Sequence, residues 1–480
     1  MIEKGADVDK ANVHGRSINT KDDSDRILPC GRGLKDYVIN QWSTKLNRVS
    51  IFVSEQRRML SEDQETALMV YQAGANLLLI GAGGTGKSFL ITKIFRESSV
   101  ITSTTGVSAF NVRGITIHSF LGIGTGSARL DVLLRRVRKN RAAVDRIRTA
   151  TSVVIDEVSM LSASLFEKMD RLCRLIRMRP EAPFGGIRLV LSGDFFQLSP
   201  VFDDSSDDHR LVFESPVFTE MFGPDNTVVL RHNHRQDHAG AFHSLLMRVR
   251  EGEQTTDDID ALTSRLDTTT PPEVLGGVHL VSTKLRAAEI NAHNMSKLST
   301  DPVLFESRFA CSGGTEANRQ WLMDELWSQL EQRDLNRVVL KKGCSVMLVM
   351  NIDVESGLVN GRTGVVADII KNHPVVSFDG GDPVIITPTT MSIDHNGATC
   401  TATFTPLIPA YALTIHKSQS LTLDRAILEL GGCFTDHMVY VALSRVRTID
   451  GISLLTFNPK KIRVNPSVVS YMNKVRKEST

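Results

Sequence analysis

The sequence predicts an α/β protein built on parallel sheets. Three apolar runs, at residues 77–80, 153–155 and 189–191, each end in polar residues that are able to carry chemistry. In a doubly wound parallel sheet the ligand binds at the carboxyl ends of the strands, so we expect one functional site where these runs end. Apolar runs alternate with helical patterns again after residue 226, which predicts a second α/β domain.

The first of these runs leads into a phosphate-binding loop. The segment GAGGTGKS, residues 81–88, matches G-x-x-x-x-G-K-[ST] at every fixed position, and a helix-compatible run follows it. Backbone N–H groups and the helix N-terminus together hold a polyphosphate. We expect Lys87 to reach the β- and γ-phosphates and Ser88 to ligate Mg²⁺. The expected loop residues are Gly81, Gly83, Gly84, Thr85 and Gly86. The chain is therefore predicted to bind a nucleoside triphosphate, with ATP and Mg²⁺ as cofactors.

The second and third runs supply the remaining chemical groups. The apolar run 153–155 ends in Asp156 and Glu157, which we assign to the metal and to the attacking water, the latter as general base. A surface acid pair is the alternative, and the β-branched residues before it argue against that. After the third run, Gln197 is the candidate sensor of the γ-phosphate, and Asp194 is a candidate support for the metal site.

Composition restricts the class of protein. At 480 residues the chain is expected to form more than one domain, and 41% hydrophobic residues with a mean hydropathy of −0.08 are typical of globular proteins. We find no apolar stretch of about 20 residues and no secretory signal, which predicts an intracellular protein without a membrane contact. The six cysteines are scattered without a C-x-x-C pair, so we expect free thiols in a reducing compartment.

One segment is strongly basic although the net charge is only +2. Residues 129–148 contain eight lysines and arginines against two aspartates. A helix here is either a solvated positive face or a contact for a nucleic-acid backbone. Composition leaves both interpretations open.

Changes in composition along the chain suggest how it divides into domains. We expect a flexible extension over 1–54 and a first domain over 55–225, with a small helical insert at 122–150. A second domain is expected from 226–343 together with 409–480. The stretch 344–408 has short β-rich segments between Gly, Asn, Asp and Pro, which predicts a small all-β insert.

The order of motifs resembles the petite integration frequency family of 5′→3′ DNA helicases, in superfamily one, type B. The resemblance covers about residues 55–460 and begins with LSEDQ, where Gln64 stands at the family's adenine-reading position. IDEVSML and the stretch from PFGG to GDFFQL follow, and the latter is the most diagnostic. In the second half, LRHNHRQ, AYALTIHKSQSLTLD and VYVALSRVRTIDGISLL match in the same order.

The resemblance implies two RecA-like motor domains that bind ATP between them, a wedge insert in the first and an SH3-like insert in the second. It implies that Arg235 and Arg445 of the second domain compensate charge on the γ-phosphate. It further implies a monomeric motor on single-stranded and forked DNA, acting in replication, repair or recombination. The implied strand contacts are Thr105, His118, Phe120, His416 and Lys417.

Two alternatives stay open, an RNA helicase of the same superfamily and a nucleic-acid clamp without catalysis. Two departures from the family's pattern are also present. Ser420 stands where the family usually has glycine, and residues 434–438 lack its usual Gly-Gln. Both departures lie in elements that the resemblance assigns to nucleic-acid coupling.

Overall fold

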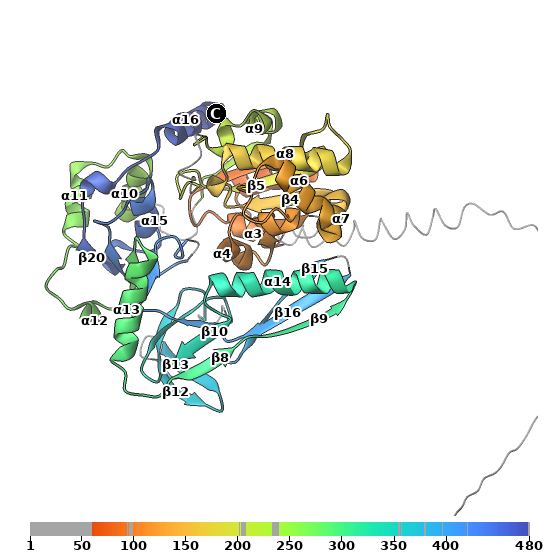
Figure 1. Cartoon of the computed structure of the whole chain (residues 1–480). Helices are drawn as coiled ribbons and strands as arrows, with labels where there is room; N and C mark the ends of the chain where they lie inside the picture. The colour runs from red at the N-terminus through yellow and green to blue at the C-terminus, as the bar shows by residue number, and fades with distance from the viewer. Residues whose placement is uncertain are drawn as a thin grey trace, which may run out of the picture. The chain divides into compact units, whose positions relative to one another are not determined.

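The computed structural model describes residues 60–478, except for positions 94, 96–98, 201, 203–207, 233–239, 354–355, 357, 379–380, 396 and 420. The expectations for the extension 1–54, for Arg235 and for Ser420 lie outside the described residues. Within them the predicted fold class is confirmed. Two parallel sheets carry helices, one part has a helical insert and the other an antiparallel β insert (Figure 1).

The first sheet has six strands in the order β3-β2-β4-β5-β1-β6, and every neighbouring pair is parallel. Its central strands are buried along their whole length, as their uninterrupted apolar runs predict for a sheet covered on both faces. The strands are β1 (Leu77–Gly81), β2 (Val100–Ser103), β3 (Ile115–Thr116), β4 (Ser152–Asp156), β5 (Arg188–Gly193) and β6 (Thr227–Leu230).

Helices connect and cover these strands. The longest, α8, begins after the N-cap Ser162, whose hydroxyl accepts from the N–H of Leu165, and it buries Met169, Leu172 and Ile176 on one face. The helices of this part are α2 (Glu62–Gln72), α3 (Lys87–Lys93), α4 (Gly106–Asn111), α5 (Ile117–Leu121), α8 (Ala163–Arg177) and α9 (Pro216–Met221).

Two short helices occupy the stretch 122–150, where a helical insert is expected. They are α6 (Leu130–Lys139) and α7 (Arg141–Thr149). Leu133, Val137 and Ile147 are fully buried, so the insert packs on the core rather than standing apart from it. Its arginines therefore divide between packed and solvated positions.

The expected boundary at 225/226 is wrong. The run that was expected to open the second domain is β6, which pairs with β1 in the first sheet and places Leu79 opposite Val228. A short apolar run carries no information about which sheet will receive it, because pairing depends on distant strands. The first sheet therefore ends at Leu230.

The second parallel sheet has the order β18-β7-β19-β20. Its strands are β7 (Val278–Val281), β18 (Ala412–Thr414), β19 (Ala426–Glu429) and β20 (Ile452–Thr456). Its helices are α10 (Ala241–Glu251), α11 (Thr256–Thr263), α12 (Pro272–Leu275), α13 (Lys284–Ser296), α15 (Met438–Leu443) and α16 (Pro466–Glu478).

The β insert is larger than expected. A five-stranded antiparallel sheet, β14-β13-β12-β11-β17, falls within the expected stretch to one residue at its end. Its strands are β11 (Ser345–Leu348), β12 (Thr363–Ile370), β13 (His373–Phe378), β14 (Val384–Ile385) and β17 (Leu407–Pro409).

The expected start of the insert at 344 is therefore too late. β15 (Thr389–His395) and β16 (Ala398–Phe404) leave that sheet and pair with β9 (Arg308–Gly313). The helix α14 (Glu316–Gln332) runs along the sheet formed by β15, β16 and β9 (Figure 1). The strand β8 (Val303–Glu306) pairs with β10 (Arg337–Leu340). Alternate residues of β16 are buried, so one face of this strand is covered by other residues. The residues that cover it lie outside the 344–408 stretch.

The expectation of free thiols is wrong for one pair. Cys311 of β9 and Cys400 of β16 are directly opposite in register and form a disulfide, with their Cα atoms 4.1 Å apart. Cys173, Cys344 and Cys433 are buried free thiols. The pair is 89 residues apart in the sequence, so spacing gave no indication of it.

None of the helices in the described part of the chain combines the length and the apolar composition of a membrane span.

Candidate functional site

The phosphate loop lies between β1 and α3, as expected. Gly84 and Gly86 have φ angles of 92° and 85°, which glycine adopts without strain. A side chain at Gly81 is excluded, because its Cβ would lie 2.5 Å from the Thr85 hydroxyl and 3.1 Å from the Leu230 carbonyl oxygen. The sequence GAGGTGKS is thus required by the space as well as by the backbone.

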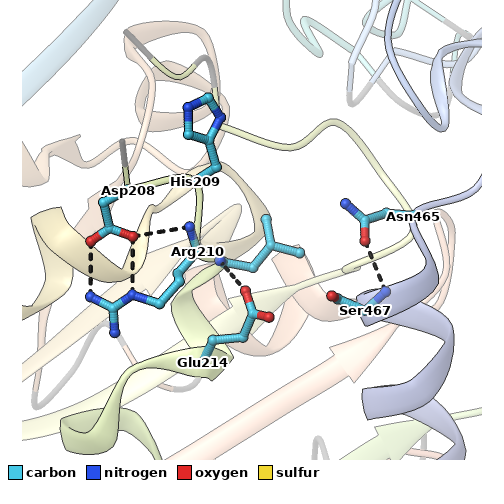
Figure 2. Close-up of a pocket in the computed structure, with 7 residues that line it drawn as sticks. Asp208, His209, Arg210, Glu214, Asn465 and Ser467 are labelled. Atoms are coloured by element: carbon cyan, nitrogen blue, oxygen red, sulfur yellow. Dashed lines mark hydrogen bonds and ion pairs between the residues drawn. The ribbon is translucent and has the colours of Figure 1, made fainter. Parts of the chain in front are cut away.

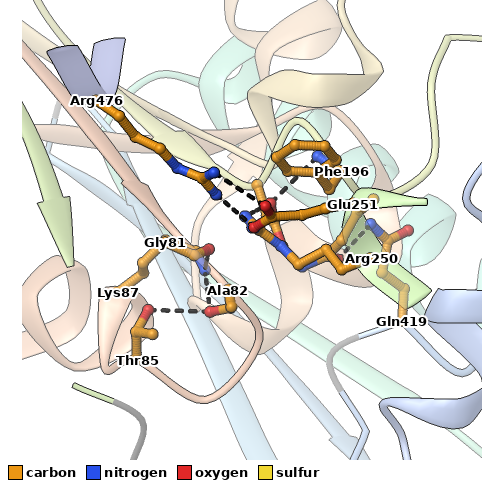
Figure 3. Close-up of polar contacts among 11 residues, drawn as sticks. Gly81, Ala82, Thr85, Lys87, Phe196, Arg250, Glu251, Gln419 and Arg476 are labelled. Atoms are coloured by element: carbon orange, nitrogen blue, oxygen red, sulfur yellow. Dashed lines mark hydrogen bonds and ion pairs between the residues drawn. The ribbon is translucent and has the colours of Figure 1, made fainter. Parts of the chain in front are cut away.

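The side chain of Lys87 hydrogen-bonds to the backbone of the loop. Its Nζ donates to the carbonyl oxygens of Gly81, at 2.6 Å, and of Ala82, at 3.0 Å, and the Thr85 hydroxyl donates to Ala82 (Figure 3). The ammonium group is therefore held against the first two residues of the loop. This is the position from which it can neutralise a bound polyphosphate.

A cavity of about 380 Å³ brings the expected nucleotide residues together. We call it the nucleotide cavity. It is lined from both parallel sheets: the loop, β4 and the segment after β5 contribute from the first, and the end of α15 from the second. Its lining residues are Gly83, Gly84, Thr85, Gly86, Lys87, Ser88, Phe89, Asp156, Glu157, Gln197, Thr422, Arg445 and Arg447.

Gln64 touches the loop rather than the cavity. It is buried at the start of α2, where Ser61 and Gln64 form a reciprocal capping box. Its side-chain amide donates to the carbonyl oxygen of Thr85 at 3.4 Å. The residue expected to read adenine is thus held against the phosphate loop.

The two carboxylates at the end of β4 are buried and differ in their surroundings. Burial raises the pKa of Asp156, and the charge of Lys87 and a hydrogen bond from the Ser108 hydroxyl oppose that rise. Glu157 has a φ of 54°, a left-handed conformation that costs about 1–3 kcal/mol for a residue with a side chain. Strain of this kind concentrates at functional sites, and here it turns Glu157 away from the line of the strand.

The donor set fits Mg²⁺ only together with a nucleotide. Ser88 and Asp156 both line the nucleotide cavity. Among the described residues, no group of three or more His, Cys, Asp or Glu is arranged to hold a metal by itself. Mg²⁺ usually takes one or two protein oxygens and completes its shell with substrate phosphates and water. Ser88 and Asp156 match that requirement.

Gln197 and Glu157 share a partner that sequence reasoning missed. The side-chain amide of Gln419 donates to Glu157 Oε2 and to Gln197 Oε1, both at 3.2 Å. Gln419 follows β18 of the second sheet. Its place in the IHKSQS motif identified it as part of a functional segment, but not as a partner of the carboxylate.

Asp194, the candidate support for the metal site, pairs with an arginine in this structure. Arg250 of α10 lies 2.6 Å from it, and both side chains are buried. Burial alone raises the pKa of Asp194, but the charge and hydrogen bonds of Arg250 outweigh burial and hold it below its usual range. A carboxylate neutralised by a guanidinium is a poor metal ligand.

Arg445, two residues after α15, lines the nucleotide cavity. Its guanidinium is held by the Val441 carbonyl oxygen at 2.8 Å and by the Ser444 hydroxyl at 2.7 Å. Burial lowers its pKa, and the charges of Tyr440, Glu157 and Asp194 oppose that effect. Arg447 lines the same cavity and pairs with Asp424, so it is a second cation that sequence reasoning missed. The VALSRVR segment, with arginines two positions apart, was the available signal.

A second cavity, of about 420 Å³, collects three of the expected strand contacts, Thr105, His416 and Lys417. We call it the strand groove. Burial and the charge of Lys284 lower the pKa of His416, and Lys417 pairs with Asp334 at 2.6 Å. The groove is lined by Thr105, Val107, Ser108, Met160, Lys284, Glu331, Gln332, Asp334, Thr414, His416, Lys417 and Gln419.

The other two expected strand contacts do not line this groove. Phe120 is only 2% exposed and belongs to the core, so it has no face to offer a base, and this expectation is wrong. Burial lowers the pKa of His118, and Glu325 opposes that effect. Phe434 is 53% exposed and its ring stacks 6.4 Å from that of His416, so it is the aromatic side chain that this region presents.

The basic side chains of the segment 129–148 differ in their surroundings, since some are packed against the protein and others are exposed. Arg146 is buried, stacks 3.8 Å from the centre of the Trp321 ring and donates to two backbone carbonyls. Arg136 donates to the carbonyl oxygen of Ile123, and Arg148 to that of Ile176. The exposed basic residues of the segment are Arg129, Arg135, Arg136, Arg138, Lys139, Arg141 and Arg148, so the two that donate to carbonyls are exposed as well.

A third hollow, of about 500 Å³, contains none of the expected residues (Figure 2). Its charges satisfy one another: Arg210 pairs with Asp208 at 2.8 Å, and Glu214 accepts from the N–H of Leu211 at 2.6 Å. Internal pairing of this kind stabilises a loop and leaves no charge directed at a ligand.

Comparison with known proteins agrees with this arrangement. The family model described as PIF1-like helicase matches residues 52–260, and the one described as the 2B domain of DNA helicase Pif1 matches residues 329–369. The ATP-dependent DNA helicase PIF1 of Xenopus laevis is 32% identical over 437 residues, which are 87% of this chain and 65% of that protein. The ATP-dependent DNA helicase Pif1 of Bdellovibrio bacteriovorus is 32% identical over 418 residues, 86% of this chain and 91% of that protein.

The chain thus spans about two thirds of the length of the vertebrate relatives it matches. Two crystal structures are also similar. Pif1 of Bacteroides sp in complex with ADP-AlF4 superposes with a TM-score of 0.71 at 25% identity, over 88% of this chain and 98% of that one. Bacteroides Pif1 bound to single-stranded DNA gives 0.57 at 25% identity, over 87% and 97%. Together with the shared motifs, these matches show that the chain belongs to the PIF1-like helicase family.

Proposed function

We propose that this chain is an ATP-driven DNA helicase that moves 5′→3′ on single-stranded DNA and unwinds forked duplex. One observation carries the proposal. Residues of both parallel sheets line a single nucleotide cavity, and residues of both also line the strand groove, with Gln419 reaching each. A motor needs this arrangement, since nucleotide state must change the relation between two parts that hold the strand.

The residues of the nucleotide cavity divide the work of hydrolysis. Lys87 and the loop N–H groups bind the phosphates, and Arg445 adds positive charge from the second sheet. Glu157 accepts the proton of the attacking water, and Gln197 lines the cavity beside Glu157. Ser88 and Asp156 would hold Mg²⁺, which when bound would supply further charge compensation. Arg235 keeps its proposed role on the strength of its motif.

The strand groove provides the expected kinds of contact with a nucleic-acid backbone. Lys417 offers a charge, Thr105 a hydroxyl and His416 a ring that stacks with exposed Phe434. Phosphate contacts hold a strand in register, and aromatic faces accept any base. Outside the groove, the seven exposed basic residues of the segment 129–148 offer further positive charge to a nucleic-acid backbone.

We also propose revised limits for the parts. The first motor domain runs to Leu230, the second comprises about 241–296 and 412–478, and the β insert, with α14, comprises about 303–409. The strand orders of the separate sheets support these limits. We further propose a monomeric motor, which is supported by the fact that residues of one chain line both cavities.

Strand-specific unwinding tests the proposal. DNA forks and RNA forks with a 5′ or a 3′ single-stranded tail are incubated with ATP and Mg²⁺. The 5′-tailed DNA fork should be separated and the 3′-tailed one should not. Preference for RNA would favour the RNA-helicase alternative, and strand binding without ATP turnover would favour the clamp.

A further inference from the structure

We propose that Gln419 is a positioning residue that couples occupation of the strand groove to the general base Glu157. The inference rests on the proposed function, because it concerns how strand binding controls ATP hydrolysis. Its basis is that the one side chain lines the strand groove and also hydrogen-bonds inside the nucleotide cavity. Gln419 is 7% exposed, so these contacts are formed away from bulk water.

The contact with Glu157 restrains the base. Gln419 Nε2 donates to Glu157 Oε2 at 3.2 Å, and this occupies an oxygen that could otherwise accept a proton from water. The second bond, to Gln197 Oε1, fixes the amide so that its N–H groups cannot turn elsewhere.

The segment before Gln419 transmits movement because it is tightly bonded. The N–H of Ser418 donates to the Thr414 carbonyl, the N–H of Gln419 to that of His416, and the N–H of Lys417 to the Thr414 hydroxyl. These bonds tie 414–419 into one compact turn. A displacement of Lys417 therefore moves Gln419, two positions further on.

Lys417 has a partner that a strand can replace. Its ammonium lies 2.6 Å from the Asp334 carboxylate, whose side chain is 68% exposed. Both residues line the strand groove. A backbone phosphate is an anion that competes with Asp334 for the same ammonium. When the phosphate replaces Asp334, the turn moves toward the strand and the hydrogen bond from Gln419 to Glu157 breaks. That oxygen of Glu157 can then accept a proton from water.

The test compares two glutamines. Gln419→Met keeps the length of the side chain and removes the donor. Gln320→Met is the matched control, since Gln320 lies on the exposed face of α14, donates to Asp324 one turn along and lines neither cavity. ATP turnover is measured without DNA and with a saturating oligothymidylate, together with the melting temperature of each variant.

Gln419→Met should raise the DNA-independent rate and lower the stimulation ratio by about tenfold, because a hydrogen bond to a charged group has about that weight. Gln320→Met should keep the ratio of the natural chain. An unchanged ratio in Gln419→Met, or a fall of both its rates by the same factor, overturns the proposal.

A second variant tests the link if Gln419→Met does not fold. Asp334 has a φ of 60°, which asparagine tolerates, so Asp334→Asn removes the competing charge without new strain. Half-maximal stimulation should then need about two- to fivefold less DNA, as expected for an exposed ion pair. An unchanged half-maximal concentration contradicts the coupling. If the natural chain itself shows no ATP turnover with DNA, the proposed function fails instead.

Discussion

Asp194 and Arg250 form a buried ion pair, in which Arg250 Nη2 lies 2.6 Å from Asp194 Oδ1. Asp194 follows β5 of the first sheet, and Arg250 lies in α10. The guanidinium also stacks 4.2 Å from the centre of the Phe196 ring, and the neighbouring Glu251 pairs with Arg476 of α16 (Figure 3). The pair therefore fixes the segment that carries Gln197 into the nucleotide cavity.

Replacing Arg250 by Met should cost about 3–5 kcal/mol of unfolding free energy, because it leaves a buried carboxylate without its partner. Chemical denaturation near neutral pH measures this loss. Arg476→Met is the control, since that side chain is 44% exposed and its pair with Glu251 is solvated. A loss as small as that of the control would show that the buried pair adds little.

The same pair predicts a pH dependence. The pKa of Asp194 is held below its usual value, so the pair stabilises the fold above the unfolded pKa of about 3.9, and this contribution is lost as pH falls through the lower folded value. In Arg250→Met burial dominates and the carboxyl prefers its protonated form. The difference in unfolding free energy between the two proteins should therefore be largest near neutrality and shrink below about pH 4.

Lys87→Ala should abolish ATP turnover and spare the binding of single-stranded DNA. Lys87 contacts the loop carbonyls of the nucleotide cavity and does not line the strand groove. Turnover is followed by phosphate release and strand binding by fluorescence anisotropy. Turnover near that of the natural chain would refute the assignment of the nucleotide cavity.

Glu157→Gln should retain binding of ATP and Mg²⁺ but lose hydrolysis. The amide keeps the shape and suits the left-handed backbone no worse than glutamate, yet it accepts no proton from water. Binding of a fluorescent ATP analogue and single-turnover hydrolysis separate the two effects. Loss of nucleotide affinity with surviving turnover would make Glu157 a metal or structural residue.

Arg445→Lys should lower kcat by about a hundredfold or more, with ATP binding close to that of the natural chain. An arginine that stabilises transferring phosphate is worth about 10³–10⁵ in rate, and lysine keeps the charge but not the fork. The bonds to Val441 and Ser444 hold this fork in place. A loss of affinity with unchanged kcat would indicate a ground-state contact only.

The exposed basic residues of α6 and α7 should matter for DNA binding. Replacing Arg135, Arg138 and Arg141 by Ala should flatten the salt dependence, because each lost phosphate contact removes about 0.7 from the log–log slope on a single strand. ATP turnover at saturating DNA should change little. Arg136 is left intact, since it donates to Ile123 and supports the local fold. An unaltered slope would identify these residues as a solvated face.

The sequence by itself determined the parts of the nucleotide cavity. The phosphate loop is one continuous segment, and its chemistry depends on backbone geometry that glycine spacing specifies locally. The apolar runs before Asp156 and Gln197 predicted parallel strands, and the carboxyl ends of such strands meet at one edge. Lys87, Ser88, Asp156, Glu157, Gln197 and Arg445 therefore line one cavity, as expected.

Only the tertiary structure decided which distant residues meet. Gln419 bonds Glu157 across 262 positions, Asp194 pairs with Arg250, and Phe120 is buried while Phe434 is exposed. The strand β6 joins the first sheet, and Cys311 faces Cys400. Sequence periodicity reports whether a residue is covered, but not by which partner. Partners are chosen by packing and register across the whole chain, and spacing along the sequence does not record them.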